Sequence, residues 1–137
     1  MSPLLVDTNV LLDVAFDDPH WADRSTQQLK AQAFHYRLII NDMTFAELSV
    51  GFTSIDAVDE FLEIAVIARE AMPKQALFAA GRAFARYRRQ AGTKANVLPD
   101  FLIGAHAAAG EMPLLTRDIR RYRTYFPTVR LIAPPIN

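Results

Sequence analysis

Short apolar runs alternate along the chain with longer segments in which apolar residues recur at helical spacing. The apolar, partly β-branched runs predict strands at residues 4–6, 37–40, 65–68, 113–115 and 129–132. The helical spacing predicts helices over residues 9–15, 20–34, 43–52, 54–62, 73–92, 100–109 and 117–126. Strands that alternate with helices indicate an α/β fold, a three-layer sandwich whose central, mainly parallel sheet is flanked by helices.

Residues that favour helix ends stand at the expected boundaries. Thr8 is placed to cap the first helix, and Pro73 and Pro99 suit the first turns of later ones. Gly110 ends the helix that Pro99 opens. No internal repeat, low-complexity tract or linker interrupts the pattern, so we expect one domain over residues 1–137.

The composition limits the kind of metal site and the class of protein that we expect. At 137 residues, 51% of them hydrophobic, the chain has the size of one compact domain. It contains no Cys, and its three His lack the close spacing of a zinc site, so any bound metal must be held by oxygen. The apolar start meets Asp7 early, and no later stretch approaches the ~20 apolar residues of a membrane span. We therefore expect a soluble, cytoplasmic protein with no membrane partner.

The net charge is zero, but the charges are unevenly divided along the chain. Residues 1–81 hold 5 Lys and Arg against 12 Asp and Glu, a balance of −7, and residues 82–137 hold 10 against 3, a balance of +7. The basic half offers a surface to a polyanion, and the acidic half has carboxylates available for a site. Solvated helix faces and pairing between the halves explain the same division, so charge alone selects no function.

Three aspartates stand at expected element ends. Asp7 follows the first strand directly, Asp118 follows the fourth strand by three residues, and Asp100 lies in the first turn of a helix. Sites in open parallel sheets lie beyond the carboxyl ends of the strands, so the three carboxylates are candidates for one site. Each of them taken singly is equally explained as a helix cap or as a favourable charge near a helix N-terminus.

Glu47 is harder to explain by capping. It lies in the middle of a predicted helix, where Phe45, Leu48 and Phe52 form the apolar stripe. Its position next to Leu48 places it near the edge of that stripe. A carboxylate in such an apolar context is a candidate functional group.

Four short motifs carry a resemblance that spans nearly the whole chain. They are VDTNVLLD at residues 6–13, AEL at 46–48, PDFLIGAHA at 99–107 and LTRD at 115–118, followed by a tail, YRTYFPTVRLI, at 122–132. In this order and spacing they resemble the PIN domains and, within them, the VapC-type toxins of bacterial and archaeal toxin-antitoxin pairs. The first motif alone would be weak support.

The resemblance implies a fold, an activity and partners. It implies a PIN-like α/β fold that gathers a catalytic group at one end of the sheet, with Asp7, Asp100 and Asp118 as ligands for Mg²⁺ or Mn²⁺. It also implies an endoribonuclease that acts as a toxin, a homodimer, and inhibition by a small antitoxin whose tail enters the acidic groove. We call the catalytic group the four-acid cluster; its members are Asp7, Glu47, Asp100 and Asp118.

The chemistry of such a cluster follows from its charges. Crowded carboxylates repel one another and raise their own pKa values unless cations neutralise them, and hard divalent ions prefer oxygen ligands. A metal can acidify a bound water and stabilise the charge that develops on a phosphodiester, so no His or Lys base is required. Asn9 and Thr116 are placed to orient a carboxylate or water, and Arg117 to reach a phosphate.

Basic residues suggest where RNA would bind. Arg82, Arg86 and Arg89 recur on one helix face, and Lys94 follows in a loop. These side chains and Arg117 suit salt-sensitive phosphate contacts, although such runs also simply solvate helix faces. The last helix adds further basic residues, namely Arg120, Arg121 and Arg123. No base specificity follows from them.

Other enzyme classes fit less well. A phosphatase that forms an aspartyl-phosphate needs a second acid where this chain has Asn9, and a receiver domain needs a Lys where it has Thr116, Arg117 and Asp118. Two alternatives remain: an RNA-processing PIN nuclease without an antitoxin, and a catalytically idle PIN-fold binding module. All four acids are present, which disfavours the idle module, and the chain is small without an added RNA-binding domain, which favours the toxin.

Overall fold

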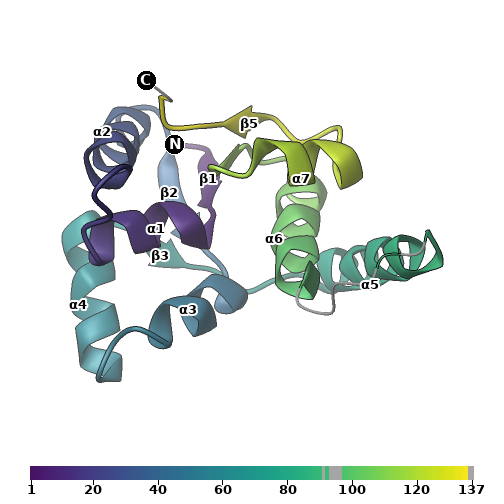
Figure 1. The fold of residues 1–137 in the computed structure, drawn as a ribbon, viewed down its shortest axis with the longest axis horizontal. Coiled ribbons are helices and arrows are strands. Elements are labelled where there is room, and N and C mark those ends of the chain that lie inside the picture. The colour runs from purple at the N-terminus through teal and green to yellow at the C-terminus, as the bar shows by residue number, and fades with distance from the viewer. Residues whose placement is uncertain (91, 93–96, 136–137) are drawn as a thin grey trace.

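A central parallel sheet organises the computed structural model, which describes residues 1–90, 92 and 97–135. Within those residues five strands pair in the order β3-β2-β1-β4-β5, and every pair is parallel (Figure 1). The strands are β1 (Pro3–Val6), β2 (Arg37–Ile40), β3 (Ala68–Arg69), β4 (Leu114–Leu115) and β5 (Leu131–Ile132).

Helices cover both faces of this sheet. They are α1 (Thr8–Ala15), α2 (Ala22–Ala33), α3 (Asp42–Ser49), α4 (Ile55–Ala65), α5 (Lys74–Arg89), α6 (Leu98–Ala109) and α7 (Ile119–Tyr125). Successive side chains of β1 point to opposite faces, so Leu4 and Val6 pack with α1 to α4 while Leu5 packs with α5 to α7. Two apolar layers thus enclose the sheet, which confirms the predicted three-layer α/β sandwich.

The ends of some helices and strands differ from the predicted ends because local capping contacts determine where a helix starts or stops. Asp18 accepts hydrogen bonds from the backbone N–H groups of His20 and Trp21, both at 2.9 Å, so α2 begins only at Ala22. Val66 adopts a left-handed conformation (φ 57°) that ends α4, and the strand predicted at residues 65–68 is displaced to Ala68–Arg69.

The predicted cap of the first helix is wrong. Asp7 holds the cap position of α1, and its Oδ1 accepts the backbone N–H of Thr8 at 2.8 Å. A carboxylate with extended backbone caps as well as a hydroxyl does, and Thr8 is already the first helical residue. Its side chain is therefore free for a different contact.

The carboxyl ends of the central strands carry polar residues. The backbone N–H of Asp7 donates to Leu115 O at 2.8 Å, so the chain leaves β1 alongside the end of β4. Asn41 follows β2, caps α3 by accepting the N–H of Thr44 at 3.1 Å, and lies 3.2 Å from Nδ1 of His106 on α6. His106 is buried. These contacts fix α1, α3 and α6 around one end of the sheet.

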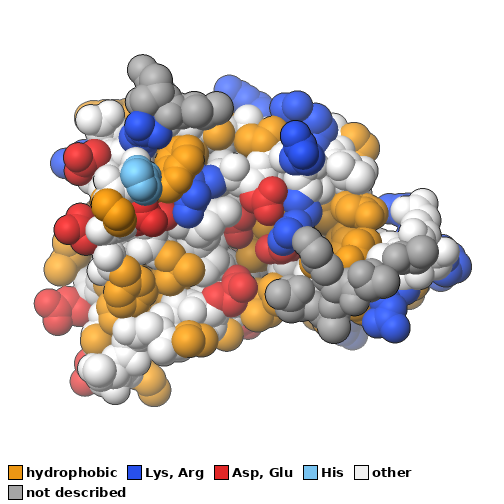
Figure 2. Space-filling model, in the orientation of Figure 1, with side chains coloured by type: hydrophobic (Ala, Val, Ile, Leu, Met, Phe, Trp, Pro, Cys, Tyr) orange, Lys and Arg blue, Asp and Glu red, His pale blue; other side chains and the backbone are white. Residues whose placement is uncertain are grey.

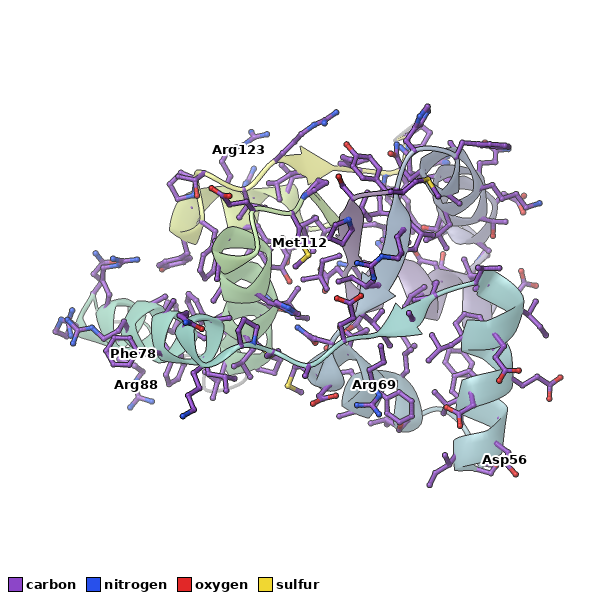
Figure 3. The ribbon with its side chains drawn as sticks, turned by 180° about the vertical axis from the view of Figure 1, so that it is seen from behind. Asp56, Arg69, Phe78, Arg88, Met112 and Arg123 are labelled. Carbon is purple, nitrogen blue, oxygen red and sulfur yellow. The ribbon has the colours of Figure 1, made fainter. Side chains whose placement is uncertain are left out.

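Helix α5 is the outlying element. It packs mainly on α6 and extends beyond it, away from the sheet (Figure 1). Phe78 and Arg88 point outward from it in Figure 3, and Phe78 is 69% exposed. None of the helices in the described part of the chain has both the length and the apolar character to cross a membrane.

Candidate functional site

Asp7 is the most buried member of the four-acid cluster, with 4% of its surface exposed. Its Oδ1 accepts the N–H of Thr8 and its Oδ2 accepts the hydroxyl of Thr116, each at 2.8 Å. Burial, assisted by the charge of Asp100, raises the pKa of Asp7 to about 6, although the two hydrogen bonds oppose the rise. The Asp7 carboxyl is therefore held rigidly and gives up its proton only near neutral pH.

Thr116 connects two of the acids. It follows β4 and is fully buried, and its Oγ1 donates to Asp7 while accepting the backbone N–H of Asp118 at 2.9 Å. Asn9 lies beside it: Nδ2 is 3.5 Å from the Thr116 hydroxyl, and Oδ1 accepts the N–H of Arg117 at 3.2 Å. Thr116 thus contacts a carboxylate directly, whereas Asn9 contacts Thr116 and the backbone of Arg117.

Glu47 reaches the site from α3. Its Oε1 accepts the hydroxyl of Thr8 at 2.6 Å, and that hydroxyl lies 3.2 Å from the hydroxyl of Thr44. Burial, and secondarily the charge of Asp100, raises the pKa of Glu47. Thr8 therefore joins the site through its side chain, a role that its sequence position did not reveal.

Asp100 and Asp118 share a cation. Nη1 of Arg121, on α7, pairs with Oδ2 of Asp100. Nε of the same arginine lies 3.5 Å from Oδ2 of Asp118. Burial raises the pKa of Asp100, whereas Arg121 acts to lower it. Asp118 precedes α7 without capping it through its side chain. Nothing in the sequence indicated that Arg121, and not Arg120 or Arg123, would pair with the acids.

The position of Tyr122 beside the acids was also not predicted from the sequence. It is 1% exposed, and burial, together with the nearby charges of Asp7 and Asp100, raises the pKa of its hydroxyl. The hydroxyl therefore stays protonated and remains a neutral donor beside the carboxylates. An aromatic residue in an amphipathic helix is usually a core residue, so nothing in the local sequence marked this one.

The acids form a concentrated negative surface. Figure 2 shows acidic side chains near the centre of one face, where α1, α3, α6 and α7 of Figure 1 meet, with Lys and Arg side chains beside them. Within the described residues, no three Asp, Glu or His side chains converge tightly enough to hold a metal as they stand. The donors are nonetheless all oxygen, and the pairing of Arg121 with Asp100 and Asp118 shows that positive charge is favoured there. The donor set fits a hard divalent ion.

The residues expected to contact RNA lie in different places. The guanidinium of Arg117 is paired with Asp13, with Nε and Oδ2 2.8 Å apart, so it is not presented to a phosphate. Arg82, Arg86 and Arg89 are exposed on α5, and the structure does not bring them into the contacts of the four-acid cluster. Lys94 lies outside the described residues.

Comparison with known proteins identifies the fold. The model of the PIN domain family matches residues 4–127. A search of curated proteins found no match.

Solved structures with the same fold include chains of toxin-antitoxin complexes. Against VapBC2 from Rickettsia felis, bound to a DNA fragment from their promoter, the TM-score is 0.74 at 20% identity, covering 97% of this chain and 99% of that one. Against VapBC-1 from nontypeable Haemophilus influenzae the TM-score is 0.71 at 17% identity, covering 96% of this chain and 97% of that one. Against a chain of a toxin-antitoxin complex from Klebsiella pneumoniae the TM-score is 0.67 at 22% identity, covering 96% of this chain and 98% of that one.

Proposed function

The chain belongs to the PIN domain family, and we propose that it is a Mg²⁺- or Mn²⁺-dependent endoribonuclease. PIN domains are nucleases, and the observation that carries the finer assignment is the four-acid cluster with its single paired guanidinium at the carboxyl end of the sheet. Carboxylates gathered in this way are typical of a site for divalent cations, because hard divalent ions prefer oxygen ligands and neutralise the mutual repulsion.

In this proposal Asp7, Asp100 and Asp118 hold the metal. When bound, a divalent ion supplies positive charge that acidifies the attacking water and stabilises the charge developing on the phosphate. The chain's own part is to fix the ligands. Thr116 holds Oδ2 of Asp7 and, through the N–H of Asp118, the start of α7.

Glu47 is linked to this ligand set through Thr8, whose N–H donates to Asp7 and whose hydroxyl donates to Glu47. Its carboxylate is aligned by the Thr8 hydroxyl, and burial raises its pKa, which suits a group that accepts and returns a proton. Tyr122 is buried close enough to Asp7 and Asp100 for both charges to raise the pKa of its hydroxyl, so it stays neutral beside them.

We further propose that the protein is the toxin of a toxin-antitoxin pair, a cytoplasmic homodimer inhibited by a small antitoxin. Support comes from the shared fold of chains in VapBC and other toxin-antitoxin complexes, and from the acidic side chains on one face, which suit a basic peptide. Arg82, Arg86, Arg89 and Lys94 are the proposed phosphate contacts. Purification of the native protein from its source without any small partner would count against the antitoxin.

Replacement of the most buried acid tests the enzymatic proposal. Asp7→Asn keeps the shape of the side chain but removes a proposed ligand, so Mg²⁺-dependent cleavage of RNA should fall by at least about a hundredfold. The matched control is Asp23→Asn, the same change at an exposed position in the first turn of α2. Wild-type protein that cuts no RNA with either metal would instead favour the idle binding module.

A further inference from the structure

Asp13 is a buried carboxylate outside the four-acid cluster. Its side chain is 3% exposed, and it accepts the hydroxyl of Ser25 at 2.8 Å. Arg117 approaches both of its oxygens, with Nη2 2.9 Å from Oδ1 and Nε 2.8 Å from Oδ2. Nη2 donates a hydrogen bond to Oδ1, while Nε is in ion-pair contact with Oδ2 without making a hydrogen bond. Loss of Arg117 would leave the buried Asp13 carboxylate without its cation.

Trp21 covers the same guanidinium. The Cζ of Arg117 lies 4.7 Å from the centre of the indole ring, within the range of a cation–π contact. Trp21 is the single Trp of the chain, so indole fluorescence comes from this residue, which Arg24 also approaches, with its Cζ 5.3 Å from the ring centre. We call Asp13, Arg117 and Trp21 the arginine brace.

The arginine brace acts on the segment that enters α7. Asn9 and Asp13 lie one turn apart on α1; the first accepts the backbone N–H of Arg117, and the second holds its guanidinium. Both the main chain and the side chain of Arg117 are thereby fastened to the helix that begins at Asp7.

The next residue is Asp118. Its side chain makes no capping bond and is 38% exposed; apart from the ion-pair contact with Arg121 at 3.5 Å, its position depends on the backbone that precedes it. That backbone is held by the N–H bond from Asp118 to Thr116 on one side and by Arg117 on the other. The brace therefore holds the backbone from which the Asp118 side chain extends.

We propose that the arginine brace positions Asp118 for divalent metal binding, and that Arg117 is a positioning residue and not a phosphate contact. This rests on the proposed function, because it takes Asp118 as a metal ligand. Groups that orient a ligand without touching the metal commonly change metal affinity by about ten- to a hundredfold.

Metal binding without RNA tests the brace. Calorimetric titration with Mn²⁺ alone should show affinity weakened by about tenfold or more in Arg117→Gln and in Asp13→Asn. The double variant should bind no more weakly than either single variant, since both changes open the same contact. Arg120→Gln, which removes an exposed Arg three residues along, should stay within about twofold of wild type.

Two readouts separate positioning from general damage. In an Asp118→Asn background, Arg117→Gln should weaken Mn²⁺ binding no further, whereas a merely structural role would weaken it in both backgrounds. The emission of Trp21 should change in Arg117→Gln and Asp13→Asn but not in Arg120→Gln. If Arg117→Gln fails to fold, Arg117→Lys keeps the charge with a single contact and should lose affinity to a smaller extent.

The outcomes distinguish this inference from the proposed function. Unchanged Mn²⁺ affinity or Trp21 emission in Arg117→Gln, with binding abolished in Asp7→Asn, would overturn the brace alone. Equal further loss in the Asp118→Asn background would also overturn it. Wild-type protein that binds no Mn²⁺ would overturn the proposed function itself.

Discussion

The guanidinium of Arg121 is paired with the carboxylate of Asp100 inside the four-acid cluster. The same side chain lies within ion-pair distance of Asp118. Although burial opposes its charge, these two carboxylates raise the pKa of Arg121, so it remains protonated wherever the protein is folded. The cluster thus carries its own counter-ion, and a divalent metal must compete with it for the two carboxylates.

Removal of this counter-ion should strengthen metal binding. Arg121→Gln leaves Asp100 and Asp118 without their competing cation, and Mn²⁺ affinity measured by calorimetry should rise by about three- to tenfold at low salt. Arg123→Gln, an exposed change on the same helix, is the control. Weaker Mn²⁺ binding in Arg121→Gln would mean that the guanidinium organises the ligands instead of competing for them.

The buried carboxyl of Asp7 should make the stability of the metal-free protein fall with rising pH. Its pKa is about 6 in the folded protein against an ordinary value of 3.8, so the folded state holds the proton more tightly than the unfolded state. Between about pH 4 and 6 the unfolded state alone has released it, and the free energy of unfolding should decrease by up to about 3 kcal/mol. Above pH 6 this contribution is constant.

Denaturation in urea and EDTA between pH 4 and 7 measures that loss. Wild type should lose stability relative to Asp7→Asn across the window, because the amide does not ionise. A difference between the two proteins that is independent of pH would show that Asp7 ionises normally.

The hydroxyl of Thr8 should matter for catalysis and little for the helix it begins. Thr8→Val keeps the shape of the side chain and the cap that Asp7 makes to the backbone of residue 8, but it removes the donor 2.6 Å from Glu47. The kcat for RNA cleavage at saturating Mg²⁺ should fall by about tenfold. Thr8→Val added to Glu47→Gln should cause no further loss of kcat. An additional tenfold loss of kcat in the double variant would mean that Thr8 does not act through Glu47.

Gly104 should tolerate no side chain. A Cβ added there would lie 2.4 Å from Cδ2 of Phe126, inside the layer between α6 and α7, and overpacking of this kind costs about 1 to 3 kcal/mol. Gly81→Ala is the matched control, because nothing lies within 4 Å of its Cβ on exposed α5, and alanine there should stabilise by about 0.5 to 1 kcal/mol. Thermal unfolding of the two variants should shift in opposite directions.

The order of strands and helices was readable from the chain because it depends on local periodicity. The apolar run of Leu4, Leu5 and Val6 is such a pattern, as is the placement of Asp7 directly after it. The positions of the three aspartates at element ends, and of Glu47 within a helix, therefore followed from the sequence alone, while their joint chemical role came from the resemblance of four motifs.

Tertiary structure decided which polar groups meet. Thr116 reaches Asp7 across 109 residues, Arg117 reaches Asp13 across 104, and Thr8 reaches Glu47 across 39. Each meeting depends on the order β3-β2-β1-β4-β5, which places β1 between β2 and β4. Short-range patterns cannot specify that order, because the pairing of distant strands is settled by how the whole core packs. The sequence by itself thus determined the elements and the acids; the packing of the sheet decided that Arg121 is their counter-ion and that Arg117 belongs to Asp13.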